Sequence, residues 1–221
     1  MNFERPYTQQ MRKVTADMTR IATVRAAIDL LSGASTAKFS MDAVAITAGI
    51  SRMTVFNMFG DKRTLLVAVY DALSSSGQLD DVTDILNAPD VEAAWARYVQ
   101  RFALFYQNHA AVMRHLRGMA SMDPDFDAVM RQRDARKDLG IAWLLQRQHG
   151  RNPLEAIRPD VQAVAHQLSA LMGFEVLDAL TQRAGGEQAA AMWRTMVAAV
   201  RRQAISAKRV TAKRLPAKRH P

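Results

Sequence analysis

The stretch AGISRMTVFNMFGDK, residues 48–62, is the feature that most limits what this chain can fold into. Gly49 interrupts a run of good helix formers, and Ser51 follows two residues later. Glycine ends helices because it adopts positive φ without a steric penalty. A serine side chain caps a following helix by accepting a hydrogen bond from its backbone N–H. The stretch therefore predicts a helix, a turn plugged by Ile50, and a short helix over about 52–58.

The rest of the chain is also predicted to be helical. Apolar residues recur at helical spacing, as at Val24, Ala27, Ile28 and Leu31, and no segment alternates with the period of a strand. Cap residues such as Ser40, and the Asp123-Pro124 pair, place helix starts. The predicted helices cover about 17–31, 41–48, 52–58, 62–73, 91–108, 110–119, 124–148, 160–183 and 187–204. The fold class is therefore all-α.

Composition excludes several kinds of chemistry. The chain has no cysteine, so disulfides, thiolate catalysis and cysteine zinc sites are absent. Its five histidines form no metal-binding motif, and no phosphate loop or nucleophile elbow is present. The segment DPDFD at 123–127 resembles the start of a calcium loop but lacks the glycine and the final glutamate; helix capping explains it better. We expect no metal, no cofactor and no enzymatic activity.

The net charge of +9 is concentrated at one end. Residues 201–221 carry eight lysines and arginines and no acid, which leaves the rest of the chain nearly neutral. Such a tail indicates a polyanionic partner, although a purely solubilising role is an equal alternative. The first residues, MNFERPYTQQMRK, lack the apolar segment of a signal peptide. No run approaches the ~20 apolar residues of a membrane span, so a cytoplasmic location is expected.

Two helices joined by a tight glycine turn form a helix-turn-helix. The second helix of this motif enters the major groove of B-DNA, about 12 Å wide, and points its N-terminal side chains at base edges. A helix as short as 52–58 does not hold itself together, which explains the cap and the apolar plug in the turn. The pattern predicts binding to double-stranded DNA.

Residues about 20–73 resemble the DNA-binding domain of tetracycline-repressor (TetR) type transcriptional regulators. The resemblance rests on Ala26-Ala27 in the first helix and on SMDAVAITAGIS, TVF and FGDKRTLL, with the family spacing kept without a gap. Beyond residue 73, only the number and length of the helices are similar. The resemblance implies a repressor that binds a palindromic operator as a homodimer and is released by a small-molecule effector.

The DNA-contacting residues implied by this resemblance depart from the family in part. Phe56 stands where the family has a phosphate-binding tyrosine, and Met53 replaces a small residue. Arg52 has the chemistry to bind guanine and Asn57 to bind adenine, whereas Phe56 or Met53 suits a thymine methyl group. Arg52 as a phosphate contact and Phe56 as a packing residue remain open. The candidates, including phosphate contacts, are Ser40, Arg52, Met53, Thr54, Phe56, Asn57 and Lys62.

A ligand pocket and a dimer interface are expected in the C-terminal part. The candidate ligand-binding residues are aromatic or large apolar residues at helical spacing, and core packing is the alternative for each: Trp95, Tyr98, Phe102, Phe105, Trp143, Met172 and Phe174. The last two helices are expected to form a four-helix bundle with a second copy. Its candidate residues are Leu168, Gly173, Trp193, Met196, Val197 and Val200.

The predicted organisation is a flexible basic arm over 1–14, a helix-turn-helix domain over 15–60 and a connecting helix over 61–76. A ligand-binding and dimerisation domain over 77–206 and a disordered basic tail over 207–221 follow. The rival function is a non-specific DNA-coating protein of the nucleoid type, driven by the basic tail.

Overall fold

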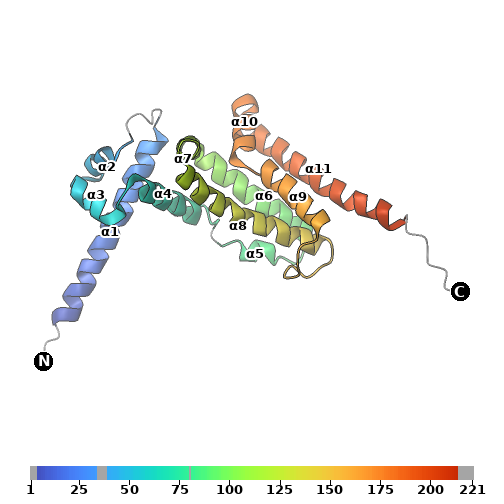
Figure 1. Cartoon of the computed structure of the whole chain (residues 1–221), viewed down its shortest axis with the longest axis horizontal. Coiled ribbons are helices and arrows are strands. Elements are labelled where there is room, and N and C mark those ends of the chain that lie inside the picture. Colours follow the sequence, from blue (N-terminus) through green and yellow to red (C-terminus); the bar gives the residue numbers. More distant parts are fainter. Residues whose placement is uncertain (1–3, 34–38, 80, 214–221) are drawn as a thin grey trace. The chain divides into compact units, whose positions relative to one another are not determined.

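A computed structural model of the chain describes residues 4–33, 39–79 and 81–213. In this part of the chain there are eleven helices and no strand (Figure 1), which confirms the predicted all-α class. The sequence predicted nine helices: it missed the short helix over 83–86, and it joined two helices into one over 160–183. The chain divides into two compact units, residues 1–76 with 109–129 and residues 77–108 with 130–221. Residues 109–129 lie inside the segment 77–206 that was expected to form the second domain. Among the described residues, no helix is long and apolar enough to cross a membrane.

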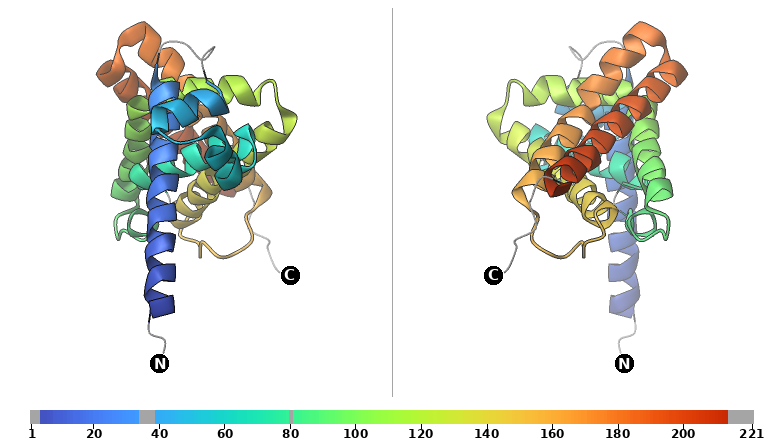
Figure 2. Two further views of the ribbon diagram at one scale, coloured as in Figure 1. Left: turned by 90° about the vertical axis from the view of Figure 1, so that its left-hand side faces the viewer. Right: turned by 90° about the vertical axis from the view of Figure 1, so that its right-hand side faces the viewer.

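The first unit is built on the long helix α1. Its helices are α1 (Glu4–Ser32), α2 (Met41–Ala48), α3 (Arg52–Phe59), α4 (Lys62–Ser76) and α7 (Ala110–Ala120), with the first residues of α8 (Pro124–Gln148). The predicted apolar stripe of α1 is buried at Val24, Ala27 and Leu31, and Val55 and Phe59 of α3 are buried in the same unit. Figures 1 and 2 show that the N-terminal half of α1 extends beyond α2 and α3.

The second unit is a bundle around α6. It contains α5 (Thr83–Leu86), α6 (Val91–Asn108), most of α8, α9 (Pro159–Leu171), α10 (Phe174–Ala184) and α11 (Gly186–Lys213). In the right view of Figure 2, α11 lies beside α9. The core holds a chain of aromatic contacts, with Tyr98 and Phe102 ring centroids 5.0 Å apart and Tyr106 and Phe174 centroids 5.6 Å apart.

The predicted helices over 91–108 and 124–148 are confirmed to the residue, but three predicted boundaries are wrong. Helix α1 begins at Glu4 rather than near Asp17, so residues 4–14, which were predicted to form a flexible basic arm, are helical. Helix α11 continues to Lys213 rather than ending near Ala204. Both extra segments are rich in strong helix formers, and Pro6 is tolerated because it lies in the first turn of α1. Residues 207–213 of the predicted disordered tail are therefore helical, and residues 214–221 lie outside the described residues.

The third error is the predicted helix over 160–183, which is two helices separated at Met172 and Gly173. Gly173 is the extended N-cap residue of α10, not a helix-interior glycine that permits close approach of another helix. The break is stabilised from another helix. Lys137 of α8 is buried, and its Nζ donates to the carbonyls of Ser169 (3.2 Å) and Met172 (3.3 Å) at the end of α9.

Candidate nucleic-acid interface

The turn between α2 and α3 is held by the residues that the sequence indicated. Ser40 accepts a hydrogen bond from the Ala43 N–H (3.1 Å) and caps α2. Gly49 has φ 67°, in the left-handed region, and its N–H reaches back to the last turn of α2. Ser51 caps α3 by accepting from the Thr54 N–H (3.0 Å). Each cap satisfies a backbone donor that a short helix otherwise leaves unpaired, so the cap predictions are confirmed.

Helix α3 has one buried face and one exposed face. Val55 and Phe59 are buried, which fixes the rotation of the helix on its unit. Met53 is 65% exposed and Phe56 is 57% exposed, although both are large and apolar. Apolar side chains that stand in solvent at this spacing have no packing role within the unit. The exposed face carries Arg52, Met53, Phe56 and Asn57.

The polar candidates beside this face have local partners. The Thr54 hydroxyl lies 2.8 Å from the Ser51 hydroxyl, and Thr54 is half-buried. Lys62, exposed at the start of α4, has its Nζ 5.3 Å from the centroid of the Phe39 ring. Ser40 is exposed but uses its hydroxyl as a cap. The structure therefore brings the four α3 residues onto one face, makes Ser40 the cap of α2, and pairs Thr54 with Ser51, the cap of α3.

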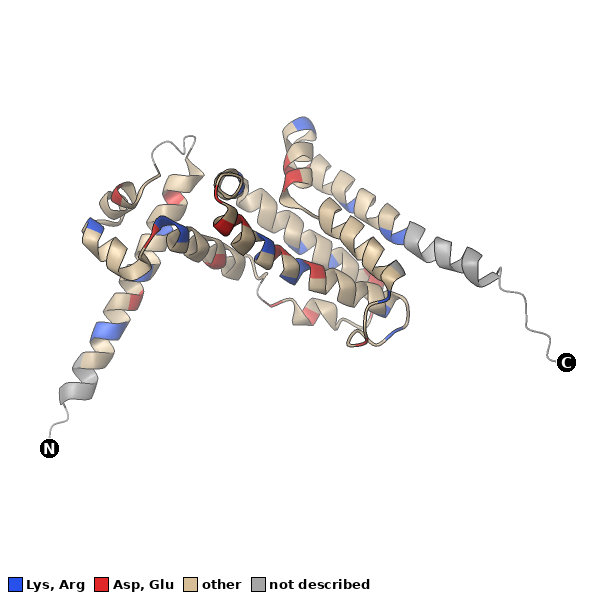
Figure 3. Cartoon of the chain, viewed as in Figure 1, with Lys and Arg blue, Asp and Glu red and all other residues tan. Residues whose placement is uncertain are grey.

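Arg52 is not isolated on the exposed face. Its Nε lies 3.1 Å from a carboxylate oxygen of Asp42 in the first turn of α2, and both side chains are mostly exposed. Figure 3 shows few charged positions on α2 and α3, so this pair dominates the local charge. An exposed ion pair is worth at most about 1 kcal/mol, so any anionic or polar partner of Arg52 has to displace only a weak contact with Asp42. Sequence reasoning missed Asp42.

We predict that Asp42→Asn raises the affinity for DNA about two- to fivefold, because it frees Arg52 and removes a negative charge beside the exposed face of α3. Fluorescence anisotropy with a labelled operator duplex at fixed salt measures the change. The matched control is Asp42→Asn in an Arg52→Ala background, where most of the gain disappears if it acts through Arg52. An equal gain in both backgrounds contradicts this explanation.

The C-terminal end of α3 is held by a residue far away in sequence. Arg20 of α1 donates from Nη1 to the Met58 carbonyl (2.9 Å), and its guanidinium lies 4.3 Å from the centroid of the Phe59 ring. A cation beside the last carbonyls of a helix is favourable. No local sequence signal relates two residues 38 positions apart, so sequence reasoning missed Arg20.

Similar solved structures have this arrangement of helices. A TetR transcription regulator from Haloarcula marismortui ATCC 43049 is similar with a TM-score of 0.67 at 15% identity, over 85% of this chain and 98% of that one. A protein from Mesorhizobium loti MAFF303099 described as a TetR-family transcriptional regulator gives 0.62 at 16% identity, over 87% and 97%. A transcriptional regulator from Streptomyces coelicolor A3(2) gives 0.60 at 18% identity, over 82% and 97%.

The chain has the TetR fold. The resemblance found on the short motif is thus confirmed at the level of the fold for most of the chain. No family model matches the sequence, and no curated protein matches it. Sequences at this level of identity share a backbone but few side chains, so function has to be argued from the residues of this chain.

Outside the helix-turn-helix of this TetR fold, α4 and α8 are tied within the first unit by an ion-pair cluster. Arg63 of α4 donates to both carboxylate oxygens of Asp123 (3.1 Å each) and pairs with Asp125 (3.0 Å). The Asp123 carboxylate also accepts from the Phe126 N–H (3.1 Å) and so caps α8. The backbone N–H of Phe126, followed by the Arg63 guanidinium, holds the pKa of Asp123 below its usual range. These contacts confirm the capping interpretation of DPDFD, and among the described residues no group of side chains is arranged to hold a metal.

The lowered pKa gives an acid-dependent stability. The stabilisation by Asp123 is complete above the unfolded-state pKa of about 3.9 and is lost as the pH falls through the lower folded-state pKa. We expect Asp123→Asn to lower the melting temperature at pH 7 and to make no difference once the pH is below the folded-state value. Melting temperatures of the parent and the variant, measured from pH 7 down to below the folded-state pKa of Asp123, test this expectation. Asp29→Asn is the control, because Asp29 is exposed on α1 with no ion pair or hydrogen bond in the described structure.

In the second unit, the predicted ligand-binding residues form core. Six of the seven are buried, and four of these six are part of the chain of aromatic contacts: Tyr98, Phe102, Phe105 and Phe174. The seventh, Trp143, is half-buried and donates to the Leu86 carbonyl (3.3 Å). Tyr98 donates to the Lys137 carbonyl (2.8 Å), and burial raises its pKa. Trp95 also lines a cavity, which lies between α6 and α11.

Three of the six predicted dimer residues lie on faces that the chain buries in its own core. Leu168, Trp193 and Val197 are fully buried within the single chain, so they have no surface to offer. Val200 and Gly173 are half-buried, and Met196 alone is exposed. The most apolar face of α11 serves the core of its own unit. A mostly apolar strip remains exposed on α11, formed by Ala191, Met192, Thr195 and Met196.

Proposed function

We propose that this protein is a sequence-specific transcriptional regulator that binds a palindromic operator as a homodimer and is released by a small-molecule effector. The observation that carries the proposal is the exposed face of α3. A helix that is capped at both ends and anchored by Val55 and Phe59 presents Arg52, Met53, Phe56 and Asn57 to solvent. This set supplies a guanine reader, an adenine reader and two methyl contacts. The similar solved structures, described as transcriptional regulators, support the same reading.

Dimerisation is proposed on geometric grounds. Two recognition helices reach successive major grooves only when they are held about 34 Å apart. The exposed strip of α11 offers a surface for the second copy, with Met192 and Met196 at 42% and 40% exposure. An effector weakens operator binding only if it prefers a state with different spacing. The proposal assigns the chain no enzymatic role, and a cytoplasmic location gives it access to chromosomal DNA.

The rival function, non-specific DNA coating, rests on the eight basic residues of 201–221. One of these eight residues is not available to bind phosphates, because Arg201 is buried and paired with Glu92. The remaining cations add sequence-neutral affinity, and each neutralised phosphate steepens the dependence of log K on log salt by about 0.9. In our proposal, this tail supports a specific regulator.

Selection of bound duplexes from a random pool tests the proposal, with the intact chain and with a chain that ends at Ser206. We expect both to recover the same palindrome, and the shorter chain to bind it with a smaller salt dependence. Recovery of no sequence, with binding lost on truncation, would establish the coating function instead.

A further inference from the structure

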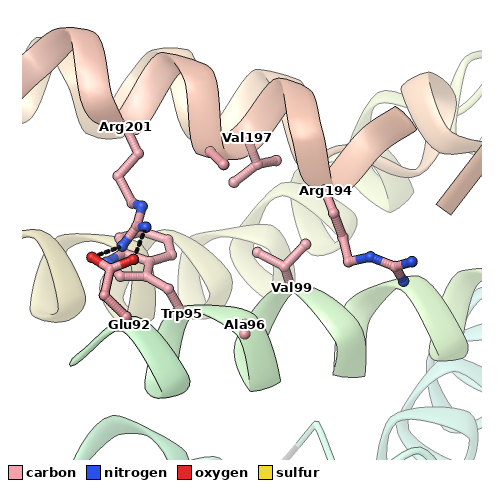
Figure 4. A pocket seen from close by; sticks show the side chains of 8 residues that line it. Glu92, Trp95, Ala96, Val99, Arg194, Val197 and Arg201 are labelled. Atoms are coloured by element: carbon pink, nitrogen blue, oxygen red, sulfur yellow. Dashed lines mark hydrogen bonds and ion pairs between the residues drawn. The ribbon is translucent and has the colours of Figure 1, made fainter. Parts of the chain in front are cut away.

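The second unit contains a cavity that none of the roles above uses. It has a volume of about 190 Å³ and lies between α6 and α11 (Figure 4). Its middle is apolar and formed by Ala96, Val99, Val197 and Ala198. Its ends are polar, with Glu92 and Arg201 meeting over Trp95 at one end and Arg194 at the other. The cavity is smaller than the ~300 Å³ of a typical site for a drug-sized molecule, so it suits a single ring or a short chain.

The charge of the Arg201 end is already balanced. Arg201 donates from both terminal nitrogens to the Glu92 carboxylate and lies 5.3 Å from the centroid of the Trp95 ring. It also donates to the Gln148 Oε1 (3.3 Å). This end nevertheless has one unused donor. The indole Nε1 of Trp95, which is 2% exposed, has no acceptor in the described part of the chain. Buried N–H groups are normally paired, so a ligand oxygen that reaches Nε1 supplies the missing hydrogen-bond partner.

The charge of the Arg194 end is not balanced. Arg194 is half-buried, and within the described residues its one hydrogen-bond partner is the neutral side-chain oxygen of Gln100 (2.7 Å). Figure 4 shows its side chain directed away from the Glu92–Arg201 pair. The lining therefore holds two guanidinium groups and one carboxylate, which leaves one positive charge beside an apolar slot. A cation is repelled by this lining, and a neutral apolar molecule leaves Arg194 uncompensated.

We propose that this cavity binds a small organic anion, an aromatic or short-chain carboxylate. The carboxylate pairs with Arg194, whose planar guanidinium matches it in a bidentate way. The apolar body lies along Val99 and Val197 towards the Trp95 end. The site is separate from the aromatic core first considered for a ligand. The binding site stands on the structure alone, and only its role as the effector site rests on the proposed function.

Benzoate is the probe, with benzamide as the neutral molecule of the same shape, and isothermal titration calorimetry with the full chain is the measurement. We expect benzoate to bind and benzamide to bind at least about tenfold more weakly. Arg194→Ala should lower benzoate affinity about tenfold, and Arg194→Lys should retain part of it. Ala198→Leu, which fills the slot but keeps Arg194, should also abolish binding. Arg183→Ala, an exposed arginine on α10, is the charge control and should change nothing.

Equal affinities for benzoate and benzamide, or unchanged binding in Arg194→Ala, would overturn the proposal. A melting curve for each variant shows whether it is folded, and the Arg194→Lys and Ala198→Leu variants keep the test decisive if Arg194→Ala is unstable. Benzoate is then added to the operator complex. Binding without an effect on DNA leaves the anion site intact and removes its regulatory role. Benzoate binding by a chain that selects no operator separates failure of the proposed function from failure of the site.

Discussion

Replacing Gly140 with alanine is expected to lower the free energy of unfolding by about 2–4 kcal/mol. Gly140 lies in α8, and a Cβ atom there would stand 2.2 Å from the Tyr98 hydroxyl oxygen and 2.7 Å from its Cζ. Tyr98 has no room to retreat, because it is 1% exposed and its hydroxyl donates to the Lys137 carbonyl. The extra methyl group therefore forces either a shift of the backbone or the loss of a buried hydrogen bond.

Urea unfolding followed by circular dichroism measures this loss, and the chain offers a matched control. Gly118 lies in α7 with open space around the position of its Cβ, so Gly118→Ala should raise stability by about 0.5–1 kcal/mol through helix propensity. In the double variant Gly140→Ala with Tyr98→Phe, part of the Gly140→Ala loss should be recovered, since the closest clash is with the hydroxyl. A Gly140→Ala chain as stable as the parent would show that α8 and α6 do not pack this closely.

Replacing Arg52 with alanine is expected to weaken binding to the selected operator about 10- to 100-fold. Arg52 is the only basic residue of α3, and its side chain is 74% exposed. A guanidinium bonded to the two acceptors of a guanine is the commonest specific contact in the major groove. Fluorescence anisotropy with the operator and with a scrambled duplex, each over a range of salt, measures both affinity and specificity.

The same experiment separates the two roles considered for Arg52. If it reads a base, the loss falls on the operator and the scrambled duplex is little affected. If it binds a phosphate, affinity falls on both duplexes and the salt slope decreases by about 0.9. Arg25→Ala, an exposed arginine on α1 with no partner in the described structure, is the control for a simple loss of charge. Unchanged binding to both duplexes would contradict a role for the exposed face of α3.

Local signals predicted the helix-turn-helix well. Ser40, Gly49 and Ser51 act on backbone groups within four residues of themselves, so their effect is readable from a short stretch of chain. The same holds for Asp123 at the start of α8. One of the wrong boundaries, the break between α9 and α10, depends on a tertiary contact. The break before Gly173 depends on Lys137, which lies on another helix and supplies the donors that the end of α9 needs.

The faces chosen for the ligand and the partner could not be predicted in the same way. Periodicity shows which face of a helix is apolar but not whether that face meets the chain's own core, a ligand or a second copy. Trp193 and Val197 have the apolar pattern of an interface, but both side chains are buried in the core of their own chain. The cavity between α6 and α11 combines residues about 100 positions apart, as the Arg201–Glu92 pair illustrates.

The sequence by itself determined the all-α class, the positions of most helices, and the short capped helix with Arg52, Met53, Phe56 and Asn57. These depend on hydrogen bonds and apolar spacing within one or two helical turns, which neighbouring residues dictate. Only the tertiary structure decided which of these side chains are exposed, which acid meets Arg52, and where an unbalanced arginine lies beside an apolar cavity. Those properties arise when segments distant in sequence pack together, because burial and charge pairing depend on every neighbour in space.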